Sequence, residues 1–253
     1  MTINALEAHA TLLTYLARYA EAEPIFRDTI ARETKLWGAE DTKTMDTRNG
    51  FAIMYLESHR YVEGAKILQE MLPVSEKMYG PEHSMTINIV SNLGGALRQQ
   101  ATPEKIAESG PYYKRALDGT RKKYGDNHPN TIKATHNYAN YLLDVGDTTQ
   151  AIALQQQVVT QGKQVFGADH DVYAEGQFGL GKALLRAQRY AEAEPALLGA
   201  IAIKQKNYGA DHWRIEEYIV PLLELYKGWN KPQQVAEWEA KRSALKPKPA
   251  NES

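Results

Sequence analysis

The sequence of 253 residues contains no cysteine, which excludes disulfide bonds and thiolate metal sites and fits a reducing compartment. Charge of one sign is not in excess either: the formal net charge is −1, so we expect no nonspecific attraction to nucleic acid or to a membrane surface. No apolar run approaches about 18 residues, and no basic stretch followed by an apolar one opens the chain. These absences predict a soluble, untargeted, cytoplasmic protein.

Motifs of known catalytic chemistry are also missing. The sequence has no His-Glu-x-x-His, no Gly-x-Ser-x-Gly, and none of the His-Arg-Asp or Asp-Phe-Gly motifs of protein kinases. The stretch from Gly176 to Lys182 reads Gly-x4-Gly-Lys, but Ala183 follows where a phosphate-binding loop needs Ser or Thr to hold magnesium. We therefore predict no enzyme activity and no cofactor, and keep a nucleotide-binding enzyme fragment as a weak alternative.

Two elements of the sequence recur. Ala-Glu-Ala-Glu-Pro at residues 191–195 follows an Arg-Tyr pair, and the same seven-residue run occupies residues 18–24. A glycine-containing loop recurs at separations of 42, 45, 42 and 42 residues, at Gly38, Gly80, Gly125, Gly167 and Gly209. A fixed period of this size predicts a repeat architecture.

Six repeats follow from this period, starting near residues 2, 44, 86, 131, 173 and 215. Apolar residues recur at intervals of three and four, as in Leu180, Ala183 and Leu184, and strand-like alternation appears nowhere over a useful length. Each repeat is predicted to contain a first helix of about 14 residues, a short turn and a longer second helix. The predicted fold class is all-α, an α-solenoid of six helix-turn-helix units over residues 2–245.

Small residues mark where two helices must approach closely. The eighth place of the first helix is small and the place three residues on is larger, in the pairs Ala10/Leu13, Ala52/Tyr55, Gly94/Leu97, Ala139/Leu142 and Gly181/Leu184. A bulky residue at the small place would overpack the contact and cost about 1–3 kcal/mol.

Two segments depart from the pattern. The third repeat is longer, and Ala101 to Lys105 together with Ser109-Gly110-Pro111 predict a longer turn, with the second helix starting near Pro111. The Pro-rich tail, residues 246–253, is predicted to be disordered.

The small-x-x-large spacing, followed by Ala and then an aromatic residue or Leu (Phe26, Leu68, Tyr113, Leu197), resembles the tetratricopeptide repeat (TPR). The 42-residue period and Gly-x-x-His-Pro-x-Thr at residues 125–131 look like the longer kinesin-light-chain type. The Glu-Ala-Glu-Pro motif is similar to repeat regions that follow the kinase domain of bacterial serine/threonine kinases. The resemblance implies a right-handed superhelix whose concave groove is lined by the first helices.

One histidine per repeat follows the loop glycine, at His83, His128, His170 and His212. Histidines spaced one per repeat should lie along a ridge and not converge on one ion, whereas a metal needs ligands about 2 Å from a common centre. We predict no metal site and expect each histidine to hydrogen-bond the start of the next helix.

The resemblance implies that the second, fifth, sixth, ninth, twelfth and thirteenth places of the first helix face the groove. Transferred to the third to fifth repeats, these places hold a group of amides and bases, from which we predict a partner-binding set: Asn88, Asn92, Arg98, Lys133, Asn137, Asn140, Lys182 and Arg186. An amide both donates and accepts, so it can pair with the backbone of an extended peptide. The alternative is that these are solvated polar residues on an exposed helix face.

The leading hypothesis is a non-catalytic protein–protein interaction module that binds a peptide or protein segment in the groove. By the resemblance, it would be a scaffold or regulatory region of a bacterial signalling protein. The alternative is self-association through an end of the array, because apolar Ile3 and Leu6 lie in the first two turns without an obvious polar cap. A homo-oligomer is then a possible form, whereas nucleic acid and membrane are not expected partners.

Overall fold

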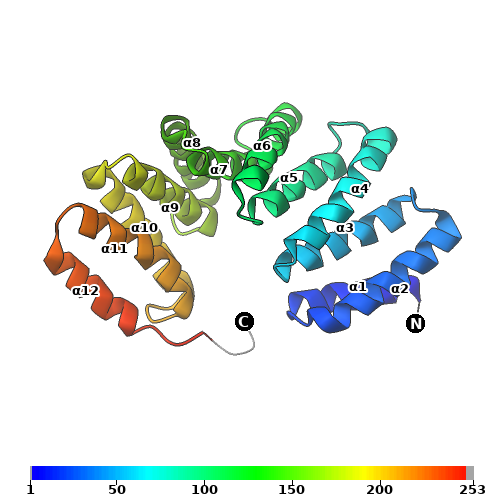
Figure 1. Ribbon diagram of the computed structural model, residues 1–253, viewed down its shortest axis with the longest axis horizontal. Helices are drawn as coiled ribbons and strands as arrows, with labels where there is room; N and C mark the ends of the chain where they lie inside the picture. Colours follow the sequence, from blue (N-terminus) through cyan, green and yellow to red (C-terminus); the bar gives the residue numbers. More distant parts are fainter. Residues whose placement is uncertain (1, 249–253) are drawn as a thin grey trace. The chain divides into compact units, whose positions relative to one another are not determined.

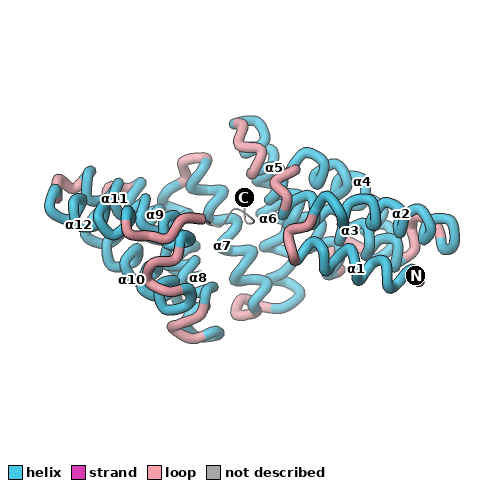
Figure 2. Tube along the Cα trace, turned by 90° about the horizontal axis from the view of Figure 1, so that it is seen from below, coloured by secondary structure: helices cyan, strands magenta, loops and turns pink. Residues whose placement is uncertain are grey.

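The computed structural model describes residues 2–248, and in that part of the chain the protein is all-α. Figures 1 and 2 show helices joined by short loops with no strand among the residues drawn, so the predicted fold class is confirmed. The chain divides into two compact units, Met1–Lys123 and Tyr124–Ser253, which we call the N-terminal and the C-terminal unit.

Each unit contains three helical hairpins. In the N-terminal unit these are α1 (Ile3–Tyr15) with α2 (Tyr19–Trp37), α3 (Thr42–Glu57) with α4 (Tyr61–Tyr79), and α5 (Ser84–Arg98) with α6 (Pro103–Tyr124). In the C-terminal unit they are α7 (Pro129–Asp144) with α8 (Thr148–Phe166), α9 (Asp171–Arg186) with α10 (Tyr190–Tyr208), and α11 (Glu216–Gly228) with α12 (Pro232–Ser243), with a short 3-10 helix (Trp213–Ile215) before α11.

Within each unit, second helices pack between two first helices. In the N-terminal unit α2 contacts both α1 and α3, and in the C-terminal unit α8 contacts both α7 and α9. Successive first helices also touch, as α1 does α3 and α7 does α9. The first helices therefore share one continuous face in each unit.

Close approach explains the predicted small residues. Ala10, Ala52 and Ala139 are completely buried, and a Cβ built on Gly181 would lie 2.6 Å from the side chain of Leu197. The larger partners three places on are buried as well: Leu13, Tyr55, Leu97, Leu142 and Leu184. The spacing read from the sequence is thus the packing code of the core.

The third repeat corrects one prediction. Its second helix does not start near Pro111 but at Pro103, and the turn before it, residues 99–102, is only one residue longer than the three-residue turns of the other hairpins. The signal was Thr102-Pro103: the Thr102 hydroxyl accepts the N–H of Lys105 at 3.3 Å, and proline suits the first position of a helix because its missing N–H would have no partner there. The additional residues lengthen α6 to 22 residues, against 19 for α4, and Pro111 lies inside it.

The loops between hairpins are built alike. Each glycine adopts a left-handed backbone, with φ between +83° and +101°, that ends the second helix: Gly38, Gly80, Gly125, Gly167 and Gly209. In four of these loops the histidine three residues after the glycine caps the next helix, as His128 Nδ1 accepts the N–H of Asn130 at 3.1 Å, and after Gly38 the carboxylate of Asp41 has this role. The histidine ring also stacks on the aromatic residue before the glycine, with centroids of Tyr124 and His128 4.4 Å apart. The predicted capping role of the loop histidines is confirmed.

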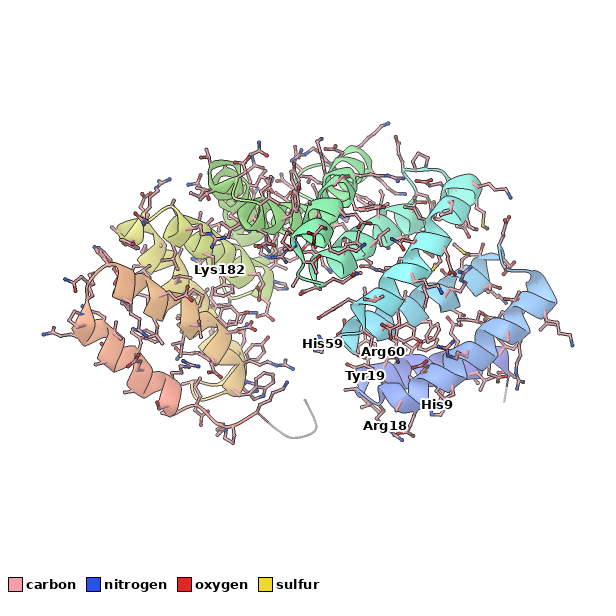
Figure 3. The ribbon with its side chains drawn as sticks, viewed as in Figure 1. His9, Arg18, Tyr19, His59, Arg60 and Lys182 are labelled. Atoms are coloured by element: carbon pink, nitrogen blue, oxygen red, sulfur yellow. The ribbon has the colours of Figure 1, made fainter. Side chains whose placement is uncertain are left out.

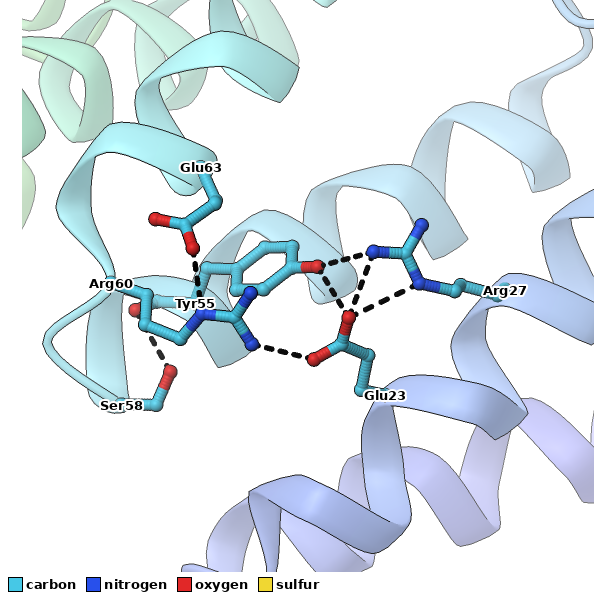
Figure 4. A network of polar contacts seen from close by, with 6 residues as sticks. All are labelled: Glu23, Arg27, Tyr55, Ser58, Arg60 and Glu63. Atoms are coloured by element: carbon cyan, nitrogen blue, oxygen red, sulfur yellow. Dashed lines mark hydrogen bonds and ion pairs between the residues drawn. The ribbon is translucent and has the colours of Figure 1, made fainter.

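The Ala-Glu-Ala-Glu-Pro motif joins neighbouring repeats. From α2, Glu23 accepts hydrogen bonds from Arg27 of the same helix and from Arg60 of the next repeat, at 2.8 and 2.6 Å (Figure 4). Arg60 in turn donates to Glu63. Burial raises the pKa of Glu23, but the hydrogen bonds from Arg27, Tyr55 and Arg60 outweigh it and lower the pKa to about 2.

The predicted disordered tail falls mostly outside the described residues, since the structure describes only its first three, 246–248. Among these, Lys246 N–H donates to the Asp211 carbonyl at 2.7 Å and the Lys248 ammonium lies 5.3 Å from the Trp213 ring. The boundary of the repeat array near residue 245 stays a prediction. No helix within residues 2–248 is long and apolar enough to span a membrane.

Candidate partner-binding surface

The first helices of the C-terminal unit enclose a hollow of about 400 Å³, which we call the C-terminal hollow. Its lining comes mainly from the groove-facing places of α7, α9 and α11: Leu143, Asp144, Lys182, Leu185, Arg186, Gln188, Tyr190, Pro221 and Glu224. Two of the predicted binding residues, Lys182 and Arg186, therefore share one cavity wall on α9, where Figure 3 labels Lys182. Asp144 and Glu224 place negative charge beside them.

Lys182 also contacts Phe178, which connects it to a group of polar residues between α9, α10 and α11. Its ammonium lies 4.6 Å from the centroid of the Phe178 ring, a cation–π distance, and Phe178 packs on Tyr218 with centroids 4.6 Å apart. The Tyr218 hydroxyl donates to Glu175 at 2.6 Å, and burial together with this carboxylate raises the Tyr218 pKa above its ordinary range.

Glu175 is held from its other side by Lys204, whose ammonium lies 2.8 Å away. Lys204 is only 3% exposed. Burial lowers its pKa, but the carboxylates of Glu175 and Asp171 outweigh burial and raise it. Glu175 on α9 therefore links Lys204 of α10 to Tyr218 of α11.

Asn140 belongs to a closed ring of hydrogen bonds. Its Nδ2 lies 2.9 Å from His136 Nε2, His136 Nδ1 lies 3.1 Å from Gln155 Oε1, and Gln155 Nε2 donates to Asn140 Oδ1 at 3.2 Å. A neutral imidazole with its proton on Nδ1 satisfies all three contacts in one direction. Gln155 is 1% exposed and Gly179 leaves it room, because a Cβ there would overlap its amide. The ring thus gives Asn140 a structural task.

Asn92 and Asn137 differ from Asn140. Both side chains are half-buried on a first helix, and neither has a hydrogen-bond partner within residues 2–248. Their amides are therefore available to a ligand. Asn88 and Lys133 are exposed, and Arg98 is half-buried at the last residue of α5. Asn88, Asn92 and Arg98 lie in the N-terminal unit and the other five in the C-terminal unit, so a single site formed by all eight stays a prediction.

The structure gives the phosphate-loop-like stretch another explanation. Residues 176–182 lie inside the continuous helix α9, not in a loop after a strand. Gly176 faces Val158 and Gly181 faces Leu197, each so closely that a Cβ would meet the neighbour within 3 Å. In the described part of the chain no group of three His, Cys, Asp or Glu residues could hold a metal ion.

A second hollow, not singled out from the sequence, lies between α1 and α3 in the N-terminal unit. This N-terminal hollow of about 410 Å³ is lined by Thr11, Thr14, Tyr15, Tyr19, Phe26, Gly50, Ile53 and Glu57. Six of these residues occupy the predicted groove-facing places of α1 and α3, the first helices of the first two repeats. The assignment of groove-facing places that was applied to the third to fifth repeats would therefore have found this hollow if it had been applied to the first two repeats.

Hairpins that stack through shared first helices define a helical-repeat protein. The tetratricopeptide repeat family model matches residues 104–161 and 132–206, so this part of the chain contains tetratricopeptide repeats. No curated protein matches the chain significantly in sequence.

Solved structures with the same fold include kinesin-light-chain-like proteins. One is a structure of nearly identical TPR-like repeats from a kinesin light chain of Podosopora anserina. It is 18% identical to this chain, the match covers 81% of this chain and 95% of that one, and the TM-score is 0.70. The chain is also similar to BtubC (BKLC) of P. vanneervenii, with 14% identity, coverage of 98% and 95%, and a TM-score of 0.65. A third similar structure is NprR in complex with its cognate peptide NprX, with 14% identity, coverage of 95% and 66%, and a TM-score of 0.62.

Proposed function

We propose that this protein is a non-catalytic interaction module that binds an extended peptide or protein segment on the shared face of its first helices. By the resemblance of its Glu-Ala-Glu-Pro motif to repeats that follow bacterial kinase domains, it serves as a scaffold or regulatory region of a cytoplasmic signalling protein in bacteria. The partner is recognised by the surface and is not chemically changed.

The C-terminal hollow carries this proposal. Its lining comes from three consecutive first helices, so a ligand there would contact three repeats at once. Lys182 and Arg186 face it, and an extended segment with acidic side chains or a free carboxylate would pair with them. The structural relative NprR is bound to a peptide, which supports a peptide as the kind of ligand.

In each unit a half-buried amide would hold the backbone of a segment bound there: Asn92 in the N-terminal unit and Asn137 in the C-terminal unit. Each hydrogen bond contributes only about 0.5–1.5 kcal/mol net, so several repeats must act together. An amide without an internal partner loses nothing within the protein when it turns to a ligand, which favours Asn92 and Asn137 over Asn140 for this role.

The test is selection of peptides from a random display library on the full chain, followed by titration calorimetry with the selected peptides. Lys182→Glu combined with Arg186→Glu should weaken the acidic peptides at least about tenfold, a loss of about 1.4 kcal/mol. Asn92→Ala with Asn137→Ala should also weaken them while leaving the melting temperature unchanged. A selection that enriches no peptide, or peptides indifferent to all four substitutions, would reject the proposal.

Self-association is the second candidate, because α1 exposes large apolar side chains. Leu12 and Leu16 are each 56% exposed, and Leu36 at the end of α2 is 62% exposed. Contiguous exposed apolar residues mark interaction surfaces. Light scattering over a concentration series distinguishes the two functions: a mass that rises with concentration and returns to the monomer value in Leu12→Ser with Leu16→Ser supports assembly, and a constant monomer mass counts against it.

A further inference from the structure

The N-terminal hollow has a different chemistry from the C-terminal one. Tyr15 is 87% exposed and Ile53 is 36% exposed, so apolar side chains stand at its mouth in contact with water. Tyr19, at the start of α2 and labelled in Figure 3, lines it as well. The volume of about 410 Å³ is at the small end of ligand pockets, which suits one or two side chains of a bound segment.

One position on the wall of the hollow has no side chain. Gly50 faces the hollow, and a Cβ at this place would lie 3.3 Å from Cε1 of Phe26. Phe26 itself is fixed, because it is 1% exposed and stacks on Phe51 with ring centroids 5.5 Å apart. A wall without a side chain, held in place by the fixed ring of Phe26 and flanked by the exposed side chains of Tyr15 and Ile53, favours an incoming aromatic or branched aliphatic side chain.

The charged residues that line the hollow or occupy the groove-facing places of α1 and α3 are all acidic. Of the residues that line the hollow only Glu57 is charged, and it has no ion-pair partner within residues 2–248. At the groove-facing places of α1 and α3 the other charged residues are Glu7 and Asp46, and none of these places holds Lys or Arg. An apolar wall with an unpaired carboxylate at its rim is complementary to an apolar side chain that neighbours a cation.

We propose that the N-terminal hollow is a specificity pocket that takes an aromatic or branched aliphatic side chain, while Glu57 pairs with a Lys or Arg next to it in the bound segment. This inference rests on the proposed function, because it takes the ligand to be an extended segment. It adds that the two units select opposite charges: the N-terminal unit a basic, apolar sequence and the C-terminal unit an acidic one.

Three synthetic peptides test the pocket on the full chain by fluorescence anisotropy: Gly-Lys-Trp-Lys-Gly, Gly-Lys-Ser-Lys-Gly and Gly-Glu-Trp-Glu-Gly, each with a fluorescein label. The Lys-Trp peptide should bind about tenfold more tightly than the Lys-Ser peptide. Glu57→Lys should weaken the Lys-Trp peptide about three- to tenfold and improve the Glu-Trp peptide. Ile53→Ser should weaken both Trp peptides.

The matched control is Glu40→Lys, the same charge change at an exposed loop residue that pairs with Lys77 away from the hollow. Glu57 is exposed at the last residue of α3, where a cation suits the helix dipole, so Glu57→Lys remains informative even if Ile53→Ser fails to fold. Equal affinities for the three peptides, or a Lys-Trp affinity that Glu57→Lys leaves unchanged, would overturn the inference.

The outcome also separates this inference from the proposed function. Peptides from the display selection that respond to Lys182→Glu with Arg186→Glu, together with a Lys-Trp peptide that ignores Glu57→Lys, reject the specificity pocket and leave the interaction module standing. If no peptide of any charge binds, the proposed function itself fails.

Discussion

The Glu23 carboxylate accepts a hydrogen bond of 2.8 Å from the phenol of Tyr55, a residue of the following repeat. The second copy of the motif repeats the arrangement, since Lys231 lies 3.7 Å from Glu194. Burial and the hydrogen bond to Glu194 both raise the pKa of Tyr226, the residue equivalent to Tyr55. The Ala-Glu-Ala-Glu-Pro motif is therefore a junction between repeats.

Glu23→Gln should destabilise the chain at neutral pH. Because the pKa of Glu23 is lower in the folded chain (about 2) than its ordinary value of 4.5, the carboxylate contributes stability above pH 4.5, and this contribution is lost as the pH falls toward 2. We expect a cost on the order of 1–2 kcal/mol at pH 7, below the full linkage value because solvent screens the partly exposed pair. Urea unfolding at a series of pH values measures it.

The control for this prediction is Glu21→Gln, two residues earlier on the same helix. Glu21 is paired with Arg18 alone, on the exposed surface, and should leave the unfolding midpoint nearly unchanged. A gap between Glu23→Gln and the unsubstituted chain that stays constant from pH 7 to pH 3 would show that the carboxylate charge is not the cause.

Asn140→Ala should lower stability, whereas Asn137→Ala should not. Loss of the Asn140 amide leaves the buried Gln155 side chain without its acceptor, which costs about 1–3 kcal/mol. Asn137 lies on the same helix but has no internal partner in the described part of the chain. Thermal unfolding followed by circular dichroism compares the two variants, and equal melting temperatures would contradict the ring of hydrogen bonds.

Gly181→Ala should destabilise and Gly95→Ala should not, although both place a methyl group on a first helix. At Gly181 the methyl would meet the Leu197 side chain at 2.6 Å, an overpacking that costs about 1–3 kcal/mol. At Gly95 the nearest atom is 3.9 Å away, and alanine is favoured over glycine inside a helix by about 0.5–1 kcal/mol. Melting temperatures that shift in opposite directions are the expected result.

The fold could be predicted from the sequence because the same local features recur from one repeat to the next. Capping histidines and small residues at helix contacts are local features, and both appear in the structure as expected. The recurring loop glycines, which set the period, all have a positive φ. The start of α6 was predicted wrongly because Gly110 and Pro111 also resemble a turn before a helix. Thr102-Pro103 is the stronger signal, since it supplies both an N-cap and a proline at the first helical position.

The binding surface could be predicted only in part. The register taken from the tetratricopeptide resemblance predicted which places face the groove, and two of the residues that it selected, Lys182 and Arg186, line a hollow. It could not separate Asn137 from Asn140, because the distinction depends on Gln155 from the next helix, a tertiary contact with no pattern in the sequence. Nor could it show that Gly50 packs against the Phe26 ring, which depends on how closely α3 approaches α2.

The loops between hairpins have a consequence for the history of such arrays. In four of the five loops the glycine, its histidine cap and the aromatic ring against that histidine lie within a few consecutive residues, as in Tyr79, Gly80 and His83. A duplication or deletion that runs from one such loop to the next would leave the new joint chemically identical to the old. The array can therefore gain or lose whole repeats, and so change the length of its first-helix face, without a new type of loop.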